Sequence, residues 1–317
     1  MSVALWTSII SWAALGWLAV VAILGIARTG RGWIRAIRFR RRSSVLDEER
    51  LNWKRWSPPV TLAILPVGGD DAVVESVNGA LRLQLPDAEI IAGVGVERQC
   101  LIETLTATFD FRRTFRVYRH EIETTRLHAV YASAAYPKLF LVVKRDAGAA
   151  DALNAAINVA GNPLFAFVTT GTRLDAAGVW RMCDEFMEAP ESLAAVTSPV
   201  RIDDAGLLAT LNEAIRIESA LPMGQGASAL AAAASSAGAF VVYRRRLLEV
   251  VGGFRPDARN PRLDAPLRLV RKLRAWQIPA DIRSFPDPVA FEESQGALDL
   301  FCRRTSGLVE SLGRYGG

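Results

Sequence analysis

The sequence predicts an α/β domain, built on a mostly parallel sheet with helices on both faces and preceded by one N-terminal transmembrane helix. Short apolar runs typical of buried strands alternate with longer segments whose apolar residues recur at helical spacing. Residues 3–27 form an uncharged, mainly apolar run, long enough to cross a hydrocarbon core of about 30 Å. We therefore expect a transmembrane anchor (1–28), a basic juxtamembrane segment and linker (29–57), and one folded domain (58–317).

The flanks of the apolar run indicate how it is used. No basic region precedes it and no small-x-small cleavage site follows it, which favours an uncleaved anchor over a signal peptide. Positive residues remain on the cytoplasmic side, so we expect a single-pass protein of the inner membrane whose folded domain lies in the cytoplasm. The segment behind the anchor suits either an interfacial helix or a plain tether. Immediately after the apolar run come Arg28, Arg31, Arg35, Arg38, Arg40, Arg41 and Arg42.

The first half of the domain reads as a strand, a helix and a strand. The apolar run at 60–66 is bounded by prolines and predicts a buried strand. Apolar residues at helical spacing predict a helix over 70–85, and Pro86 ends it before a second apolar strand at 89–96. This order is that of a βαβ unit, which makes a parallel strand pair.

The second half continues the alternation after an insertion at 97–137. We expect a strand at 139–143, an alanine-rich helix at 149–160, a strand at 163–168 and a helix at 175–187. Ligands of such sheets usually bind beyond the carboxyl ends of the strands. The important loops are those that follow Pro66, Gly93 and Val168.

Composition excludes several classes of function. The net charge is +5, but much of the arginine is concentrated near the N-terminus and no basic-aromatic module follows, so we expect no nucleic-acid partner. Cys100, Cys183 and Cys302 are odd in number and lack CxxC spacing, which argues against a disulfide framework or a zinc site. His120 and His128 have no acidic or thiol partners at ligand spacing.

Four segments, in order, resemble the family 2 glycosyltransferases, the group with cellulose-synthase-like and N-acetylglucosaminyltransferase members. The resemblance covers the chain from Pro59 to Leu312. It is carried by VTLAILPVGGDDAVVESVNGALRLQLPDAEII (60–91), GAADALNAAI (148–157), SAGAFVVYRRRLLEVVGGF (236–254) and FPDPVAFEES (285–294).

The resemblance implies a GT-A fold and an inverting transfer of sugar from a nucleotide donor. In the family an aspartate after the second strand holds the base, and an Asp-x-Asp loop after the fourth holds a divalent metal on the diphosphate. A Glu-Asp pair supplies the base that deprotonates the acceptor hydroxyl. Each group has a physical task, because the leaving diphosphate accumulates charge and a sugar hydroxyl is a poor nucleophile.

This chain departs from the family at the nucleotide and metal positions. Val94 and Gly95 occupy the place of the base-binding aspartate, and Ala149 replaces the expected lysine. Thr169 and Gly171 stand where the metal loop has its two aspartates, and neutral groups are poor ligands for a hard cation. We therefore expect the ancestral Mg/Mn site to be lost and no cofactor to be used. The nucleotide-side positions that retain the family residue include Pro66, Asp151 and Asn154.

It also departs at the catalytic and acceptor positions. Pro261 and Arg262 replace the Glu-Asp pair, and neither can act as a general base; Asp264 is a possible substitute after a local shift, and Asp257 fits less well. The final QxxRW motif falls on LFCRRTSGL, which has no tryptophan. The acceptor-side positions are Gly238, Ala239, Phe240, Arg304 and Leu308.

Losses at four positions favour a pseudo-glycosyltransferase that binds no nucleotide sugar. We expect a structural or regulatory subunit that works with an active glycosyltransferase or a polysaccharide-export assembly at the membrane. One alternative is an active, metal-independent transferase in which Arg262, or the arginines at 244–246, neutralises the diphosphate. Another is a module that binds glycan or lipid in the old acceptor cleft.

Overall fold

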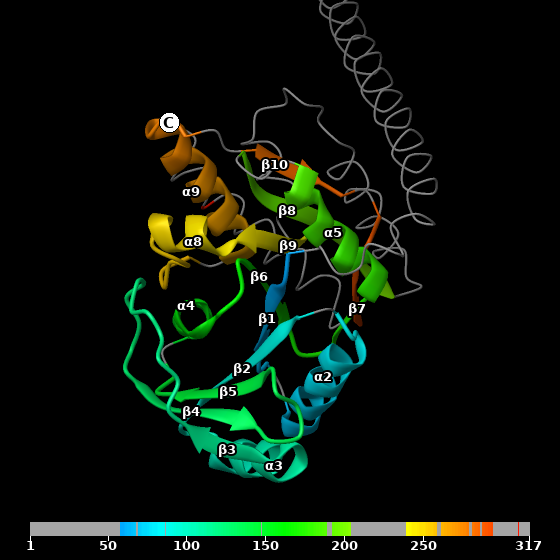
Figure 1. The fold of residues 1–317 in the computed structure, drawn as a ribbon, viewed down its shortest axis with the longest axis vertical. Helices are drawn as coiled ribbons and strands as arrows, with labels where there is room; N and C mark the ends of the chain where they lie inside the picture. Colours follow the sequence, from blue (N-terminus) through cyan, green and yellow to red (C-terminus); the bar gives the residue numbers. More distant parts are fainter. Residues whose placement is uncertain are drawn as a thin grey trace, which may run out of the picture.

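The fold was analysed in a computed structural model of the chain (Figure 1). It describes residues 58–67, 69–85, 87–146, 148–188, 192–203, 239–258, 261–278, 281–285, 287–293 and 310. The predicted anchor (1–28) and the basic segment and linker (29–57) lie outside the described residues. No helix in the described part of the chain combines the length and the apolar character needed to span a membrane.

The centre of the sheet consists of four parallel strands. The first strand pairs on one side with the second and on the other side with the sixth, and all of its residues are buried, as expected of a strand covered on both faces. The second strand pairs in turn with the fifth. These four strands are β1 (Val60–Leu65), β2 (Glu89–Gly95), β5 (Leu139–Lys144) and β6 (Leu164–Thr169).

The remaining strands make the sheet mixed, which corrects the expectation of a mostly parallel one. The insertion at 97–137 contains two strands, of which one pairs antiparallel with β5 and the other pairs antiparallel with that strand at the sheet edge. On the other side, the strand at 239–244 pairs antiparallel with β6. Among the described strands, five pairs are parallel and five are antiparallel. The added strands are β3 (Phe111–Thr114), β4 (Leu127–Ser133), β7 (Thr172–Leu174), β8 (Leu193–Asp203), β9 (Ala239–Arg244), β10 (Asp281–Ser284) and β11 (Ala290–Glu293).

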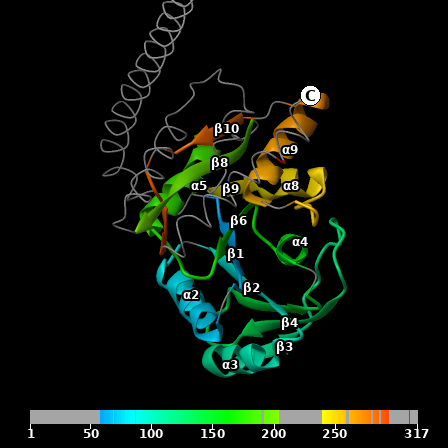
Figure 2. The same cartoon turned by 180° about the vertical axis from the view of Figure 1, so that it is seen from behind.

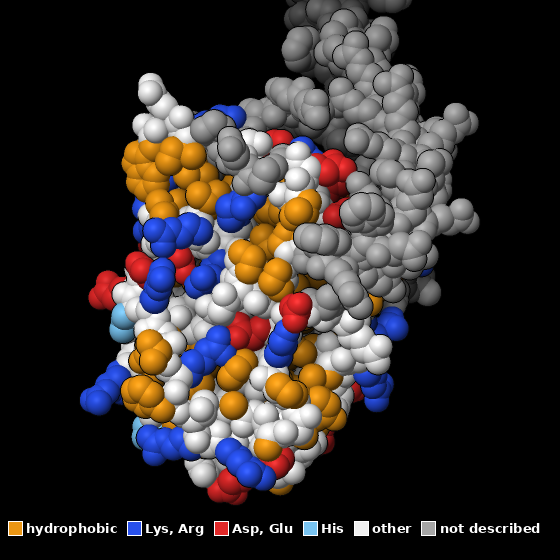
Figure 3. Space-filling model, in the orientation of Figure 1, with side chains coloured by type: hydrophobic (Ala, Val, Ile, Leu, Met, Phe, Trp, Pro, Cys, Tyr) orange, Lys and Arg blue, Asp and Glu red, His pale blue; other side chains and the backbone are white. Residues whose placement is uncertain are grey.

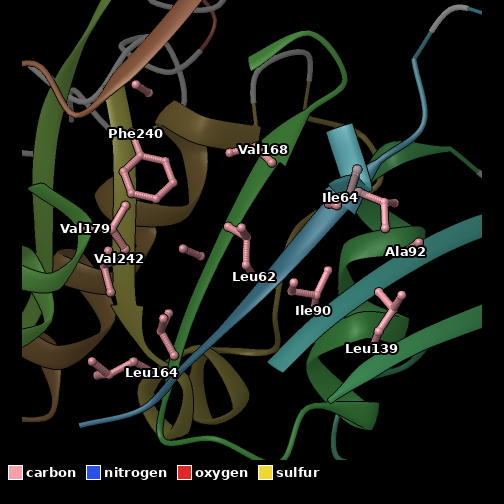
Figure 4. Packing of buried hydrophobic residues seen from close by; sticks show 14 of the residues in the cluster. Leu62, Ile64, Ile90, Ala92, Leu139, Leu164, Val168, Val179, Phe240 and Val242 are labelled. Carbon is pink, nitrogen blue, oxygen red and sulfur yellow. The ribbon is translucent and has the colours of Figure 1, made fainter. Parts of the chain in front are cut away.

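Helices cover both faces of the sheet, as predicted. One buried cluster joins the strands to α2 (Asp70–Arg82), α3 (Gln99–Phe109) and α5 (Ala176–Glu188). Figure 4 shows part of it, with Leu62 and Val179 among the labelled side chains. The other cluster joins the opposite face to α4, α8 and α9, so that α2 and α5 lie on one side of the central strands and α4, α8 and α9 on the other (Figures 1 and 2). These last helices are α4 (Ala149–Val159), α8 (Arg245–Val251) and α9 (Pro261–Ala275).

The predicted elements match the observed ones closely. The strand expected at 60–66 is β1, the alanine-rich helix is α4, and the helix expected at 175–187 is α5. The helix expected at 70–85 ends earlier, at Arg82, because Leu83 caps it and Gln84 takes a left-handed conformation with φ of 47°.

Candidate functional site

The candidate site is the edge of the sheet where β1, β2, β5 and β6 all end. The parallel registers bring Leu65 beside Thr169 and Gly95 beside Lys144 at this edge. The loops that follow these strands therefore lie together, as in other parallel α/β sheets that bind ligands beyond their carboxyl ends. Several of the positions that the resemblance assigns to nucleotide and metal lie on this edge, namely Pro66, the pair Val94 and Gly95, and the loop that holds Thr169 and Gly171.

The loop after β6 is closed onto the loop after β1. Thr170 accepts a hydrogen bond at 3.1 Å from the Val67 amide, and its own hydroxyl donates to the Val67 carbonyl. The Gly171 amide donates to Ser76 Oγ of α2 at 3.1 Å. Gly171 has φ of +81°, a conformation that favours glycine. The loop at the expected metal position is thus held by neutral groups, which form hydrogen bonds with the loop after β1 and with α2.

The side chains at this loop do not fit the divalent metal that the family resemblance implies. Thr169 Oγ1 lies 3.2 Å from Thr172 Oγ1, and the Thr172 hydroxyl lies 3.2 Å from Glu292 Oε1. Glu292, on β11, thus brings one carboxylate close to the loop, whereas Mg²⁺ and similar hard cations prefer several oxygen ligands, carboxylates among them. Within the described residues, no three His, Cys, Asp or Glu side chains gather as a metal site would require.

The end of β2 carries a carboxylate that the sequence pattern did not reveal. Val94 is buried and offers no polar group, but Glu97 folds back over Gly95 and accepts a hydrogen bond at 3.2 Å from the Asp146 amide beyond β5. A Cβ on Gly95 would lie 2.9 Å from Glu97 Oε2, so a larger residue here would displace the end of the Glu97 side chain. Glu97 therefore links two of the four loops.

Arg98 links the loops after β1 and β2. Its guanidinium donates to the Pro66 carbonyl at 3.3 Å and to Asp70 Oδ1 at 2.5 Å, at the start of α2. The side chain is partly exposed, at 30%. Pro66, which the family resemblance marks as retained, thus supplies a backbone acceptor that holds this arginine. The pairing of Arg98 with Asp70 could not be predicted from spacing in the sequence, because the two residues are 28 positions apart.

Asp151, at the start of α4, belongs to a buried ion pair. Lys144 and the Thr125 amide and hydroxyl all donate to its carboxylate, the Thr125 bonds at 2.9 and 2.7 Å. Burial raises the pKa of Asp151, but the hydrogen bonds from Lys144 and Thr125 outweigh it and hold the pKa below its usual value. This aspartate thus holds Thr125 beside the start of α4. Ala149, which replaces the family lysine, is the first residue of that helix.

Asn154 joins α4 to the turn that follows α8. Its side-chain amide donates to the Phe254 carbonyl at 2.9 Å and accepts from the Phe254 amide at 2.6 Å. Gly253 has φ of +67°, and a Cβ there would collide with Asn154 Oδ1 and approach Ile122 Cγ2 to 2.7 Å. These retained residues form a packed junction, which accounts for their presence without catalysis.

Asp264, the possible substitute for the lost base, is a buried residue of α9. Its side chain is 4% exposed and lies 3.7 Å from Arg268 Nε. Arg268 in turn donates to the Gly253 carbonyl. Pro261 is the first residue of the same helix. Asp257, the other acid considered, is exposed and forms an ion pair with Arg255 at 2.7 Å.

Arginines 244–246 lie at the wrong edge of the sheet for a diphosphate bound beyond the strand ends. Arg244 pairs with Leu164, the first residue of β6, and the Arg245 amide donates to the Pro163 carbonyl at 2.9 Å. Burial lowers the pKa of Arg244, whose Nε donates to the Leu193 carbonyl. Of the acceptor-side positions, Ala239 and Phe240 begin β9, whereas Gly238, Arg304 and Leu308 lie outside the described residues.

Comparison with solved structures identifies the fold. The mannosyltransferase PcManGT from Pyrobaculum calidifontis, in complex with GDP-Man and Mn2+, is similar with a TM-score of 0.54 and 15% identity, over 82% of this chain and 65% of that chain. S. aureus TarS 1-349 has a TM-score of 0.45 and 10% identity, over 80% and 65% of the two chains, and a mycobacterial protein has 0.46 and 12%, over 84% and 78%. This chain thus spans less than two thirds of PcManGT.

Sequence comparison adds no closer relative. No protein-family model matches the chain, and no curated protein matches it. At 15% identity the likeness to PcManGT concerns the fold alone, and the other two scores lie below 0.5 and carry no weight in the assignment. The described part of the chain has a mixed α/β fold of the type found in GT-A glycosyltransferases.

Proposed function

We propose that this protein is a pseudo-glycosyltransferase, a GT-A-type domain that does not transfer sugar and acts as a structural or regulatory subunit. In this proposal its partner is an active glycosyltransferase or an export assembly for polysaccharide or glycolipid. The predicted N-terminal anchor would hold it at the inner membrane, with the folded domain in the cytoplasm.

The observation that carries the proposal is the loop after β6. A transferase that neutralises a leaving diphosphate with a metal needs carboxylates here, and this chain has Thr169 and Gly171. The adjacent Thr170 and the Gly171 amide bond to the loop after β1 and to α2. Hydrogen bonds within the chain therefore occupy groups that would otherwise face a ligand.

The state of the acidic residues supports the same conclusion. A general base must reach the acceptor hydroxyl, but Asp264 is buried against Arg268. Asp151 is held by Lys144 and Thr125. Both aspartates stabilise the fold, and neither has the exposure that proton transfer from a bound sugar requires.

Calorimetric titration of the full-length protein with a panel of uridine and guanosine diphosphate sugars, with and without Mn²⁺ or Mg²⁺, tests the proposal. We expect no binding heat in either condition. The double variant Thr169→Asp/Gly171→Asp is the matched comparison, since it restores two carboxylates at the loop and aspartate tolerates a positive φ better than most residues. Micromolar affinity of the unmodified chain for any member of the panel would refute the proposal.

One observation favours a second candidate, an active metal-independent transferase. Arg98 places a partly exposed guanidinium at the site edge, where arginine charge can replace a metal on a diphosphate. Its salt bridge to Asp70 opposes this use, because part of the charge is already balanced. If the titration gives binding without metal and Arg98→Gln abolishes it, this second candidate replaces the first.

A further inference from the structure

The segment 111–120, which contains β3 and the residues after it, combines exposed apolar side chains with exposed arginines. Its sequence, FRRTFRVYRH, has four arginines, one histidine and no acidic residue. Phe115 is 94% exposed and Val117 is 85% exposed, the two most exposed large hydrophobic residues in the described part of the chain. Tyr118 is 36% exposed. Isolated apolar residues are common on surfaces, but two such neighbours in a basic segment are not.

The backbone that carries these side chains is anchored on both sides. Arg116, between Phe115 and Val117, turns inward to a salt bridge of 2.5 Å with Glu89 and lies 4.1 Å from the centre of the Phe140 ring. Further along, the Ile122 amide donates to Asn158 Oδ1 at 3.0 Å, and Asn158 donates back to the Ile122 carbonyl at 2.8 Å. The backbone that carries Phe115 and Val117 is therefore held by contacts at Arg116 and at Ile122.

The exposed charges inside the segment are positive, and exposed acidic residues flank it on both sides. Arg113 and Arg119 are exposed, and neither forms an ion pair with a described residue. Arg112 is paired with Asp110 at 3.0 Å. The acidic residues that follow, Glu121 and Glu123, are exposed.

The segment also lies at an edge of the molecule. β3 is the outermost strand of the sheet on its side, since it pairs only with β4 among the described strands. Figure 3 shows blue and orange side chains next to each other along the lower left margin, where Figure 1 draws β3 and the segment that leads from it to β4.

We propose that the segment 111–120 docks on an anionic lipid bilayer. Phe115 and Val117 enter the boundary between headgroups and acyl chains, and Arg113 and Arg119 contact lipid phosphates. A lipid surface suits the segment because its exposed apolar side chains match the acyl-chain boundary and its exposed arginines match the phosphate layer. The segment itself contains no acidic residue that the phosphates would repel. This contact goes beyond the proposed function and does not depend on it.

A fluorescent probe at position 117 tests the proposal in the full-length chain. The variant Val117→Cys is labelled with an environment-sensitive dye in a Cys100→Ser/Cys302→Ser background. Cys183 remains unlabelled, because it is buried and its burial raises its thiol pKa to about 12. The labelled protein is incorporated into vesicles of phosphatidylcholine, alone or with phosphatidylglycerol. The matched control is Met187→Cys in the same background, labelled with the same dye, because Met187 on α5 is 52% exposed.

We expect the emission of the dye at 117 to shift to shorter wavelength, and its quenching by aqueous iodide to fall, only in the anionic vesicles. High salt and the variant Arg113→Gln/Arg119→Gln should each reverse the shift, since the attraction to anionic lipid falls with each charge removed. The dye at 187 should not respond. An unshifted dye at 117 in anionic vesicles, or an equal shift at 187, overturns the proposal; in the first case a protein partner for the β3 edge becomes the better explanation.

Discussion

The junction around α4 and the loops at the carboxyl edge of the sheet differ in how well they match the glycosyltransferase resemblance. The junction keeps family residues, and there Asn154, Phe254 and Gly253 form a buried, closely packed unit. The edge has neutral residues where the resemblance expects acidic ones, and there Thr170 accepts a hydrogen bond from the Val67 amide. The residues that match the resemblance here support the fold, whereas the positions that the resemblance assigns to the nucleotide and metal carry other residues.

The difference shows that a retained motif residue is not by itself a sign of retained chemistry. Asp151 and Asn154 belong to the same segment that resembles the family, and each makes hydrogen bonds that hold neighbouring segments together. Removing such bonds leaves buried groups without partners, which costs more than an average hydrogen bond contributes. The following variants test the comparison, beginning with the largest expected effect.

Gly253→Ala should cause the largest loss of stability. The new Cβ would collide with Asn154 Oδ1 at a backbone position with φ of +67°, so we expect a cost of about 3 kcal/mol or more and a fall in Tm of about 10 °C. Gly252→Ala is the matched control. It also has a positive φ, of +87°, but no atom lies within 4 Å of the position that its Cβ would take, so its cost should be about 1 kcal/mol. Equal thermal melting temperatures for the two variants would contradict the packed junction.

Asn154→Ala should destabilise the domain by about 2 to 3 kcal/mol, because it leaves the buried amide and carbonyl of Phe254 without their partner. Urea unfolding followed by circular dichroism measures the change. Asn162→Ala is the control, since its side chain also makes two hydrogen bonds to the backbone, donating to the carbonyls of Val60 and Asp87, but in a more exposed place. If Asn154→Ala lowered the free energy of unfolding no more than Asn162→Ala does, the bonds of Asn154 to Phe254 would not be the stabilising contact described here.

Asp151→Asn should change how stability depends on pH. The pKa of Asp151 is lower in the folded protein than its ordinary value of 3.8, so its contribution to stability is present above that pH and is lost as the pH falls toward the folded-state pKa. The variant should therefore be less stable than the parent chain near neutral pH and should lose less stability below about pH 4. Parallel curves of unfolding free energy against pH would contradict the assignment of the ion pair with Lys144.

Thr170→Val should have the smallest effect, about 1 kcal/mol, because the hydrogen bonds between the loops after β6 and β1 are exposed and water can replace them. Hydrogen exchange at the Val67 amide is the more sensitive measurement and should become faster. Thr104→Val serves as the control, since its hydroxyl bonds only within α3, to the Cys100 carbonyl. Unchanged exchange at Val67 would mean that the two loops are not closed by Thr170.

The sequence predicted most of the central elements but only part of the site. Apolar runs identify β1 and β6 because buried parallel strands have no polar face. The strands β3 and β4 were missed inside the insertion, since β3 has only four residues and exposes Arg112 and Arg113, so its pattern resembles a loop. The mixed character of the sheet depends on these strand directions, which periodicity does not encode.

The site residues that were missed are those paired over long distances in the chain. Glu97 accepts a hydrogen bond from the Asp146 amide, 49 positions away, and the Thr172 hydroxyl donates to Glu292, 120 positions away. The pattern of a single sequence indicates which residues share one face of a helix or strand. These contacts instead join segments that come together only when the whole sheet has formed. The departures from the resemblance, by contrast, could be predicted from the motif alone, because threonine and glycine at positions where the motif has aspartate are visible in the sequence.

The central claim is that the carboxyl edge of the sheet does not hold a divalent cation on a nucleotide diphosphate. Electron paramagnetic resonance of Mn²⁺ tests it most directly, with a guanosine or uridine diphosphate sugar present and the full-length protein added in steps. We expect the spectrum to remain that of Mn²⁺ with nucleotide alone, since Thr169 and Gly171 provide no carboxylate. A stoichiometric loss of that signal on adding the protein, reversed in Thr169→Ala, would contradict the account.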